Sequence, residues 1–504
     1  MHPYNQNLPE QVPTKNRFFR RVKDLLFVNR STKQTIVKNV FWLSFSQIFG
    51  RIFRAGILIY AARVLGSEGY GVFSYALGLA GFFTAFADIG VSSIVTREAA
   101  RQPEKRSEYF STAFLIKLVL LTLTVGAIVF ITPHFSNVVG AAVLIPIVAF
   151  LTFLDGIRDF SLSYFRAQEK MEWEAVVTLI LNISIAIFGF IVLRISPTPK
   201  ALTYAYVFSA GMGAFSAVFL LRKEFAKLIS NFRKTLLKPI LISALPIAVS
   251  GFFGMFMLNT DYVILGWMRG AAEIGFYAAA QKIVQVFYVL PGLVATGIFP
   301  STSRLIGEKK HGNVKSINEQ AIVLMLLIAM PLAVGGIILA GPIIALLYGA
   351  EYMPATLAFQ LLVATTPFVF IGTILGNLLF AYDQQKKTAI YVGVAAVANV
   401  LLDLLLIPLF GIYGSSAGTL AVQFIYLFFM YRLISSINRL TIVSKLKKVI
   451  LATITMGTVS FFLNLAGLHV LLNIAASILI YFAFLLVLKE VTLNELKKIV
   501  QRFK

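Results

Sequence analysis

Residues 109–132 read YFSTAFLIKLVLLTLTVGAIVFIT and carry a single charged side chain, Lys117, in 24 residues. A helix that crosses a lipid bilayer needs about 20 predominantly apolar residues, so this stretch predicts a membrane span. The whole chain has the same character: 58% of its 504 residues are hydrophobic and 13% are charged, against roughly 45–50% and 25% in soluble proteins. The composition excludes an ordinary soluble enzyme and predicts an all-α integral membrane protein.

Fourteen such apolar runs are separated by charged turns or by turns that contain Gly or Pro. They lie near residues 40–62, 70–95, 109–132, 138–156, 175–194, 201–221, 239–261, 275–300, 320–345, 355–381, 388–408, 413–431, 449–466 and 468–488. The last two runs together are too long for one span, which favours a turn at residues 466–469. We therefore expect fourteen transmembrane helices.

The 45 Lys and Arg residues test this layout, because basic residues gather in cytoplasmic loops. Alternate segments, starting from the N-terminal one, hold 37 of the 45. The intervening loops hold Arg63, Arg194, Lys200 and Arg269, and the remaining four, Arg51, Arg54, Lys117 and Lys282, fall inside spans. This alternation predicts a multi-pass protein of the cytoplasmic membrane with both termini cytoplasmic. The formal net charge of +23 then reflects topology rather than nucleic-acid binding.

Basic segments precede the first span and follow the last one. In the leader, Phe18, Val22, Leu25 and Leu26 recur at helical spacing among basic residues, and the tail repeats the pattern with Leu496, Ile499, Val500 and Phe503. Both segments predict amphipathic helices that contact anionic lipids of the inner leaflet. The leader is long, polar and basic and precedes a run of full spanning length, which is unlike a cleaved signal peptide.

The expected organisation has six parts: a leader (1–39), a first lobe of six spans (40–221), a cytoplasmic linker (222–238), a second lobe of six spans (239–431), two further spans (432–488) and a tail (489–504). A shift of 204 residues supports two lobes, because it sets Gly66, Gly71, Phe73 and Ala76 against Gly270, Gly275, Tyr277 and Ala280. Such a duplication predicts like-oriented lobes with the transport path between them.

Several classes of site are not supported by the sequence. The chain has no cysteine, and its four histidines (His2, His134, His311, His469) are far apart, so no metal site is expected. The closest approach to a phosphate-binding loop, residues 307–312, continues into Asn313 and lacks the required Lys and Ser or Thr, so no nucleotide-driven pump is expected. We expect a transporter without a cofactor.

Several short motifs recur in a characteristic order along the chain. The first half contains ARVLGSEGYG at 62–71, ADIG at 87–90 and TRE at 96–98. The second half contains GFY at 275–277, FP at 299–300, SR at 303–304 and LYG at 347–349. In this order the chain resembles the polysaccharide (O-antigen-type) flippases of the multidrug/oligosaccharidyl-lipid/polysaccharide exporter superfamily. Ser67 stands where such proteins often have proline.

The resemblance implies a flippase that carries polyprenyl-pyrophosphate-linked oligosaccharide units across the cytoplasmic membrane for cell-surface polysaccharide biosynthesis, alongside other polysaccharide-assembly membrane proteins. Murein-precursor (lipid II) flippases of the same superfamily also have fourteen spans and stay an alternative. A drug/cation antiporter is a second alternative, although it should present acidic rather than basic groups. A membrane glycan polymerase would need a sizeable outer loop, and the predicted outer loops are all short.

Arg51 and Arg54 fall near the middle of the first span, and with Gln47 they share one helix face. A central Arg costs roughly 2.5–3.5 kcal/mol on insertion scales, so both need partners or water. Two readings stay open: fixed ion pairs with carboxylates such as Asp88 or Asp403, or a wet cavity for an anionic head group. A guanidinium matches phosphate geometrically, which favours a pyrophosphate site.

Lys282 lies about 10 Å inside the eighth span, with Gln281 and Gln285 at helical spacing. It either extends to the outer surface or joins a polar patch that binds the pyrophosphate; murein-precursor flippases are similar here, with a basic residue in the corresponding helix. Lys117, by contrast, is expected to extend to the inner surface.

Three further polar residues fall in the second lobe: Asp261 ends the seventh span, and Asn399 and Asp403 are one turn apart in the eleventh. Carboxylates in this setting either couple transport to an ion gradient or serve as counter-ions for the arginines. Asp88 reads instead as a structural residue at a helix end.

Pro291, Pro331 and Pro367 fall near the middles of the eighth, ninth and tenth spans. Because proline removes a backbone hydrogen bond and can kink a helix, they are either hinge positions for a bending second lobe or static kinks.

Overall fold

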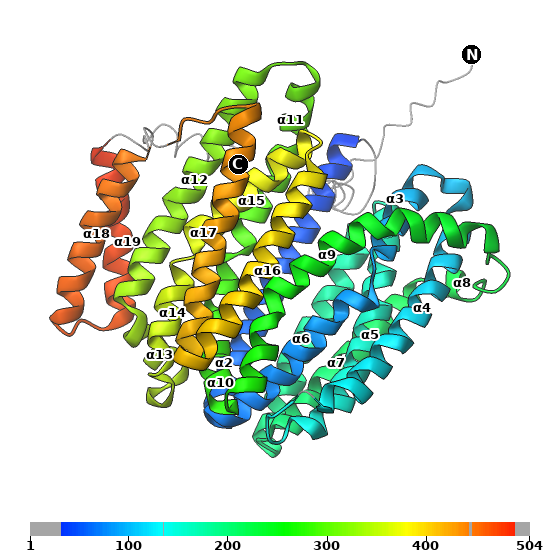
Figure 1. The fold of residues 1–504 in the computed structure, drawn as a ribbon, viewed down its shortest axis with the longest axis horizontal. Helices are drawn as coiled ribbons and strands as arrows, with labels where there is room; N and C mark the ends of the chain where they lie inside the picture. The colour runs from blue at the N-terminus through cyan, green and yellow to red at the C-terminus, as the bar shows by residue number, and fades with distance from the viewer. Residues whose placement is uncertain (1–31, 135, 443–445, 489–504) are drawn as a thin grey trace, which may run out of the picture.

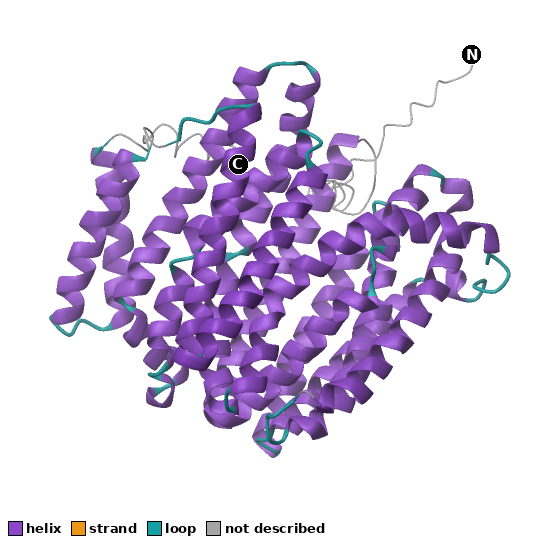
Figure 2. Cartoon of the chain, in the orientation of Figure 1, coloured by secondary structure: helices purple, strands orange, loops and turns teal. Residues whose placement is uncertain are grey.

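The computed structural model describes residues 32–134, 136–442 and 446–488. These parts of the chain contain helices, turns and loops and no strand, which confirms the all-helical prediction (Figure 2). The amphipathic segments predicted for the leader and the tail lie mostly or wholly outside the described residues. Twelve helical stretches of the described chain are long and apolar enough to cross a membrane, and thirteen if the bent pair Lys38–Ala87 with Val91–Arg101 is counted.

The helices follow one another as labelled in Figure 1. They are α2 (Thr32–Ala87), α3 (Val91–Arg101), α4 (Arg106–Ile131), α5 (Ala141–Ala167), α6 (Met171–Ile195), α7 (Pro199–Leu220), α8 (Arg222–Phe225), α9 (Lys234–Met268), α10 (Ala271–Phe287), α11 (Val289–Gly307), α12 (His311–Ile338), α13 (Ala340–Tyr348), α14 (Ala355–Val363), α15 (Thr366–Ala381), α16 (Gln385–Phe410), α17 (Ile412–Ile437), α18 (Lys447–Leu465) and α19 (Val470–Val487), with short 3-10 turns η1 (Pro103–Lys105), η2 (Thr132–His134) and η3 (Ala350–Tyr352).

Each of the fourteen predicted runs falls on helix, but several boundaries differ from the prediction. The first two runs both lie in α2, which is divided by a non-helical residue at Gly66, and the second continues past a break into α3. The eighth is split into α10 and α11, the tenth into α14 and α15, and the ninth ends at Ile338 before α13. The fourth continues as helix to Ala167 instead of ending near residue 156.

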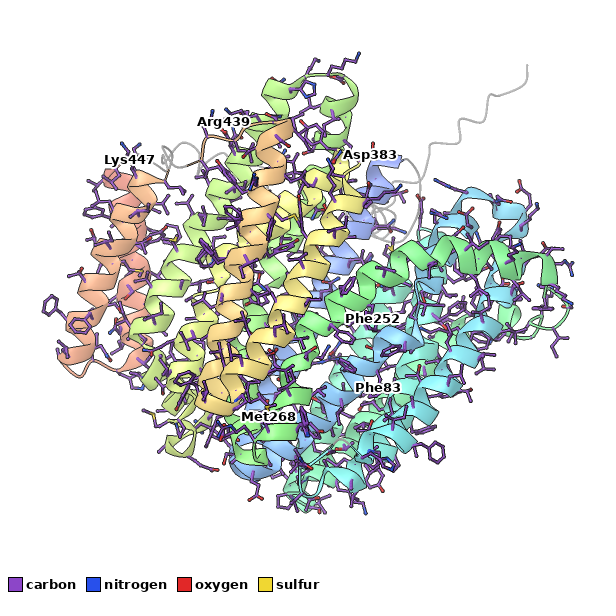
Figure 3. All side chains as sticks on the ribbon, in the orientation of Figure 1. Phe83, Phe252, Met268, Asp383, Arg439 and Lys447 are labelled. Carbon is purple, nitrogen blue, oxygen red and sulfur yellow. The ribbon has the colours of Figure 1, made fainter. Side chains whose placement is uncertain are left out.

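Two faces of the bundle are needed to describe the site. We call the end where α2 begins and α19 ends the terminal face, and the end where α2 bends at Gly66 the opposite face. In Figure 1 the terminal face is at the top. Asp383, Arg439 and Lys447 lie at the terminal face and Met268 at the opposite face (Figure 3).

The apolar core is shared at the opposite face and divided at the terminal face. One cluster joins residues of α2 and α7, such as Phe73 and Tyr206, to residues of α10 and α14, such as Tyr277 and Phe359. Towards the terminal face a second cluster belongs to α3–α7 and the start of α9, and a third to α11, α12, α15 and α17. The two groups of helices are therefore packed together at one end of the bundle and separately at the other.

The two groups approach most closely where α2 crosses α10. A methyl group on Gly71 would overlap the carbonyl oxygen of Ala271, and one on Gly275 would overlap that of Ser67. Gly71 and Gly275 are also the residues that the 204-residue shift sets against each other. Only glycine permits this approach, because any Cβ would force the helices apart.

The bend in α2 is bound to the turn after α13. Gly66 has a φ of 67°, a conformation that favours glycine. The next amide, of Ser67, donates a 2.6 Å hydrogen bond to the Glu351 carboxylate, which caps the second half of α2. The Arg63 guanidinium donates a 2.7 Å bond to the carbonyl oxygen of Leu347 at the end of α13. The negative Glu351 thus lies at the N-terminus of the second half of α2, and the positive Arg63 lies at the C-terminus of α13. Both charges have the sign that a helix dipole favours.

The helices α18 and α19 pack against each other and against the outside of α12, at the left edge of Figure 1. Their small core includes Ala452, Met456, Tyr481 and Leu485, and the Tyr481 hydroxyl donates to the carbonyl oxygen of Leu327. This pair is peripheral to both helix groups.

Candidate functional site

A cavity of about 390 Å³ lies between the first half of α2, α6 and α10. It contains all five residues that the sequence suggested for pyrophosphate binding: Gln47, Arg51, Arg54, Lys282 and Gln285. The other residues that line it are Ser46, Gly50, Ala55, Leu58, Thr178, Asn182 and Val286. The helical spacing of 47, 51 and 54 places these side chains on one side of α2, as the sequence indicated.

The two arginines are held by neutral groups rather than by carboxylates. Arg51 donates a 2.8 Å hydrogen bond to the main-chain carbonyl oxygen of Gln285, and Arg54 donates a 3.2 Å bond to the Asn182 side-chain oxygen. Within the described part of the chain neither arginine forms an ion pair, so the pairs considered with Asp88 and Asp403 are absent there.

Lys282 reaches the cavity from the α10 side. Its ammonium group donates a 3.3 Å hydrogen bond to the Gln285 side chain and lies 5.9 Å from the centre of the Tyr262 ring. The reading in which it extends to the surface does not hold, because it lines the cavity. Three cationic side chains with neutral hydrogen-bond partners thus line one cavity. Such a site favours an anion, and guanidinium groups match phosphate oxygens.

The sequence offered no reason to single out Asn182, although it fixes Arg54. Its amide nitrogen donates 2.8 Å to the carbonyl oxygen of Thr178 one turn earlier, which turns the side-chain oxygen towards Arg54. Gly50 makes room, since a Cβ there would approach the Asn182 amide to 2.7 Å. Only the contact between α2 and α6 could have shown this arrangement.

Asp261, Asn399 and Asp403 are brought together, at a place separate from the cavity lining. Asp261 lies on α9 and the other two on α16, and all three are at most 2% exposed. The Tyr277 hydroxyl donates to Asp261. The other Asp261 oxygen, Oδ1, and both Asp403 oxygens are buried and form no hydrogen bond within the described part of the chain. Among the described residues neither carboxylate forms an ion pair with an arginine.

Two of the three prolines follow breaks in the helices of their spans, and the third lies inside a helix as expected. Pro291 lies in the first turn of α11 and Pro367 in the first turn of α15, so both follow breaks in the helix. Pro331 alone is inside a continuous helix, α12. The two breaks face each other, because the hydroxyls of Tyr288 and Thr365 are 2.5 Å apart.

The expectation for Lys117 was wrong. Its side chain is 2% exposed, and its ammonium group lies 2.9 Å from Asp88. Asp88 also accepts a 3.2 Å hydrogen bond from the Ser92 amide, so it caps α3 at the end of α2, consistent with a structural helix-end residue. Apolar sequence around Lys117 suggested an extended side chain, whereas a partner from another helix holds it inside.

A second polar surface lies on the α5 and α6 helices, towards the terminal face. Arg158 pairs with Asp155 and, at 2.7 Å, with Asp159, and Arg166 forms a two-pronged pair with Glu174 at 2.5 and 2.8 Å. The sequence placed Arg158 and Arg166 in a loop, because the helix was expected to end near residue 156.

Comparisons with known proteins agree with this fold. A family model described as "Polysaccharide biosynthesis protein" matches residues 36–306, and a second model, MatE, matches residues 246–405. The "Probable low-salt glycan biosynthesis flippase Agl15" of Haloferax volcanii is 24% identical over 385 residues, which cover 75% of this chain and 79% of that protein.

Two further relatives extend the similarity. The "Capsular polysaccharide biosynthesis protein CapF" of Staphylococcus aureus is 20% identical over 402 residues, covering 79% of this chain and 98% of that one. Among solved structures, "Lipid II flippase MurJ, inward closed conformation" superposes with a TM-score of 0.74 at 20% identity, covering 89% and 98% of the two chains.

Proposed function

The chain belongs to the polysaccharide biosynthesis protein family, and from that premise we propose that it is a lipid-linked glycan flippase that moves polyprenyl-pyrophosphate-linked oligosaccharides by alternating access. The observation that carries the proposal is the cavity in which Arg51, Arg54 and Lys282 face the same space without carboxylate partners among the described residues. Named relatives are flippases and polysaccharide biosynthesis proteins. No bond is made or broken in this process.

In this proposal the pyrophosphate binds to Arg51, Arg54 and Lys282, while Gln47 and Gln285 add neutral hydrogen bonds. Phosphate oxygens accept several charge-assisted hydrogen bonds at once, and guanidinium donors present them in a planar fork. The polyprenyl chain stays in the bilayer, because it gains nothing from leaving the lipid.

We further propose fourteen membrane crossings with the terminal face cytoplasmic. The bend at Gly66 lets α2 supply two crossings, and the remaining helices supply twelve. The 37 basic residues of alternate segments support the orientation. The resulting parts are those expected from the sequence: two lobes of six crossings at 40–221 and 239–431, a linker, a peripheral pair, and amphipathic ends on anionic lipid.

The shared core at the opposite face and the divided cores at the terminal face support a cytoplasm-facing state of the carrier. Switching then requires the two lobes to part where α2 crosses α10. Tyr288, Thr365, Pro291 and Pro367 mark where α10–α11 and α14–α15 can bend, with Pro331 in the neighbouring helix. If Pro291→Ala and Pro331→Ala leave transport unaltered, the hinge role is removed.

The pair Asp261 and Asp403, with Asn399, is our candidate for ion coupling. Buried carboxylates at the junction of two helices can bind a proton or a sodium ion and so respond to a gradient. Asp403→Asn should abolish the dependence of flipping on an imposed proton or sodium gradient. A variant that keeps the full gradient dependence would assign these residues a structural role.

The alternative substrate within the same chemistry is lipid II, since a murein-precursor flippase shares the fold at a TM-score of 0.74. A cation antiporter is not favoured, because the cavity presents three cations. Other polysaccharide-assembly proteins are candidate partners, and only the membership of the family supports them.

Flipping of a fluorescent lipid-pyrophosphate-oligosaccharide in proteoliposomes tests the proposal. Arg51→Ala, Arg54→Ala and Lys282→Ala should each slow flipping by roughly tenfold or more, as expected when a hydrogen bond to a charged group is lost. Lys200→Ala is the matched control, because this lysine lies in the first turn of α7, beside Tyr204 and outside the cavity lining. Equal rates in all variants would contradict the assignment of the cavity, and no flipping by the wild type would favour another function.

A further inference from the structure

On α5, the residues of the polar surface follow one another at helical spacing. Residues 148, 152, 155, 159 and 166 form one stripe along α5. Val148 and Thr152 of this stripe are buried in the half of α5 near the opposite face. Asp155, Asp159 and Arg166 continue it towards the terminal face, where Asp159 is 57% exposed. The stripe is therefore buried near the opposite face and becomes exposed towards the terminal face.

Two carboxylates of this surface, those of Asp155 and Asp159, lie at membrane depth. At the helical rise, Asp155 is about 21 Å and Asp159 about 27 Å along α5 from its first residue, Ala141, at the opposite face. The hydrocarbon layer is about 30 Å thick, so both carboxylates fall within it or at its edge. Ionisable groups at this depth are costly and are retained where they face water or a ligand.

The helix α6 contributes both to this surface and to the lining of the cation-lined cavity. On α6, Glu174, Thr178 and Asn182 follow one another at one-turn intervals, and the last two line the cavity. From Asn182 to Glu174 the distance along α6 is about 12 Å. A ligand whose phosphates bind Arg54 could therefore extend along this surface towards the terminal face.

The charges of the surface differ from those of the cavity. Three carboxylates, of Asp155, Asp159 and Glu174, are interleaved with only two guanidinium groups, of Arg158 and Arg166. Asp159 accepts hydrogen bonds from Arg158 through Oδ1, and in the described chain no partner reaches its Oδ2. A second phosphate would be repelled here, whereas hydroxyl groups can donate to the carboxylates and accept from the guanidinium groups.

We propose that Asp155, Arg158, Asp159, Arg166 and Glu174 form a glycan subsite that hydrogen-bonds the hydroxyl groups of the sugar units while the pyrophosphate occupies the cavity. This proposal rests on the proposed function. It identifies the sugar units as the part of the substrate that this surface binds. Carboxylates held in place by arginine pairs are pre-oriented acceptors. They can therefore bind hydroxyl groups with a smaller loss of side-chain entropy.

Binding to the full-length protein in nanodiscs separates the two proposals. The probes are polyprenyl pyrophosphate with and without an attached oligosaccharide. Asp159→Asn should weaken binding of the glycan-bearing lipid about tenfold and change binding of the bare lipid by less than twofold. Arg54→Ala should weaken binding of both lipids. Asp159 is more than half exposed, so its replacement leaves packing intact.

Glu308→Gln is the matched control, since this glutamate is exposed at the terminal face and pairs with Lys310. If Asp159→Asn binds both lipids as the wild type does, or loses both equally, the glycan subsite is overturned while the cavity assignment stands. If the wild type binds neither lipid, or Arg54→Ala changes neither affinity, the proposed function is overturned and the subsite with it.

Discussion

Arg54 is fixed by the side-chain oxygen of Asn182, which in turn is oriented by its own bond to Thr178. Asn182→Ala leaves the guanidinium without this acceptor, so the arginine should lose its orientation towards the cavity. We expect the concentration of lipid-linked glycan that gives half-maximal flipping to rise about fivefold to tenfold. Ser184→Ala, two residues along α6 and bonded to Met212 instead, serves as control. Unchanged kinetics in Asn182→Ala would mean that Arg54 is positioned by other contacts.

Lys117 stays buried inside the bundle because its ammonium group pairs with Asp88 at the end of α2. Lys117→Met leaves Asp88 without its ammonium partner, and we expect a loss of roughly 2 kcal/mol or more in stability. Thermal unfolding in detergent should show the lower midpoint. Adding Asp88→Asn should restore much of the loss, because the double variant has no unpaired charge. A double variant as unstable as the sum of both single changes would contradict this account.

At the scale of elements, Glu351 connects the turn after α13 to the second half of α2 by capping its first amide. Glu351→Ala should remove about 1–2 kcal/mol from the contact between the lobes. The opposite face should then open more often. Glu351→Gln keeps an acceptor oxygen and should have a smaller effect.

Opening at this face can be measured with a cysteine, because the protein has none of its own. Ala279 on α10 is fully buried in the shared core. Ala279→Cys should react with a water-soluble thiol reagent faster in the Glu351→Ala background than in the wild-type background. Equal labelling rates would show that the capping bond does not control opening.

At the scale of the whole molecule, the two faces should be reached from different sides of the membrane. Val139 lies at the opposite face, before α5, and is 86% exposed, whereas Asn313 is exposed near the terminal face, at the start of α12. In intact cells, Val139→Cys should react with an impermeant thiol reagent, and Asn313→Cys only after permeabilisation. The reverse pattern would invert the proposed orientation.

Much of the fold was predictable because membrane helices obey local rules. Apolar runs of spanning length have no other stable form in lipid, since every backbone group must be paired within the helix. Boundaries failed where the local sequence was ambiguous: α5 continues through Arg158, Asp159 and Arg166, whose charges suggested a loop after residue 156. Ion pairs make these charges acceptable in a helix: Arg158 pairs with Asp155 and Asp159 on α5 itself, and Arg166 pairs with Glu174 on the facing α6.

The sequence by itself determined that the chain is helical, that its motifs are those of a polysaccharide biosynthesis protein, and that Arg51, Arg54 and Lys282 are unusual for a membrane span. These properties depend on periodicity and composition, which are local. Helix packing decided that these cations share a cavity, that Lys117 pairs with Asp88, and that Arg166 of α5 pairs with Glu174 of α6. Each depends on contacts between different segments of the chain, which only the packing of helices specifies.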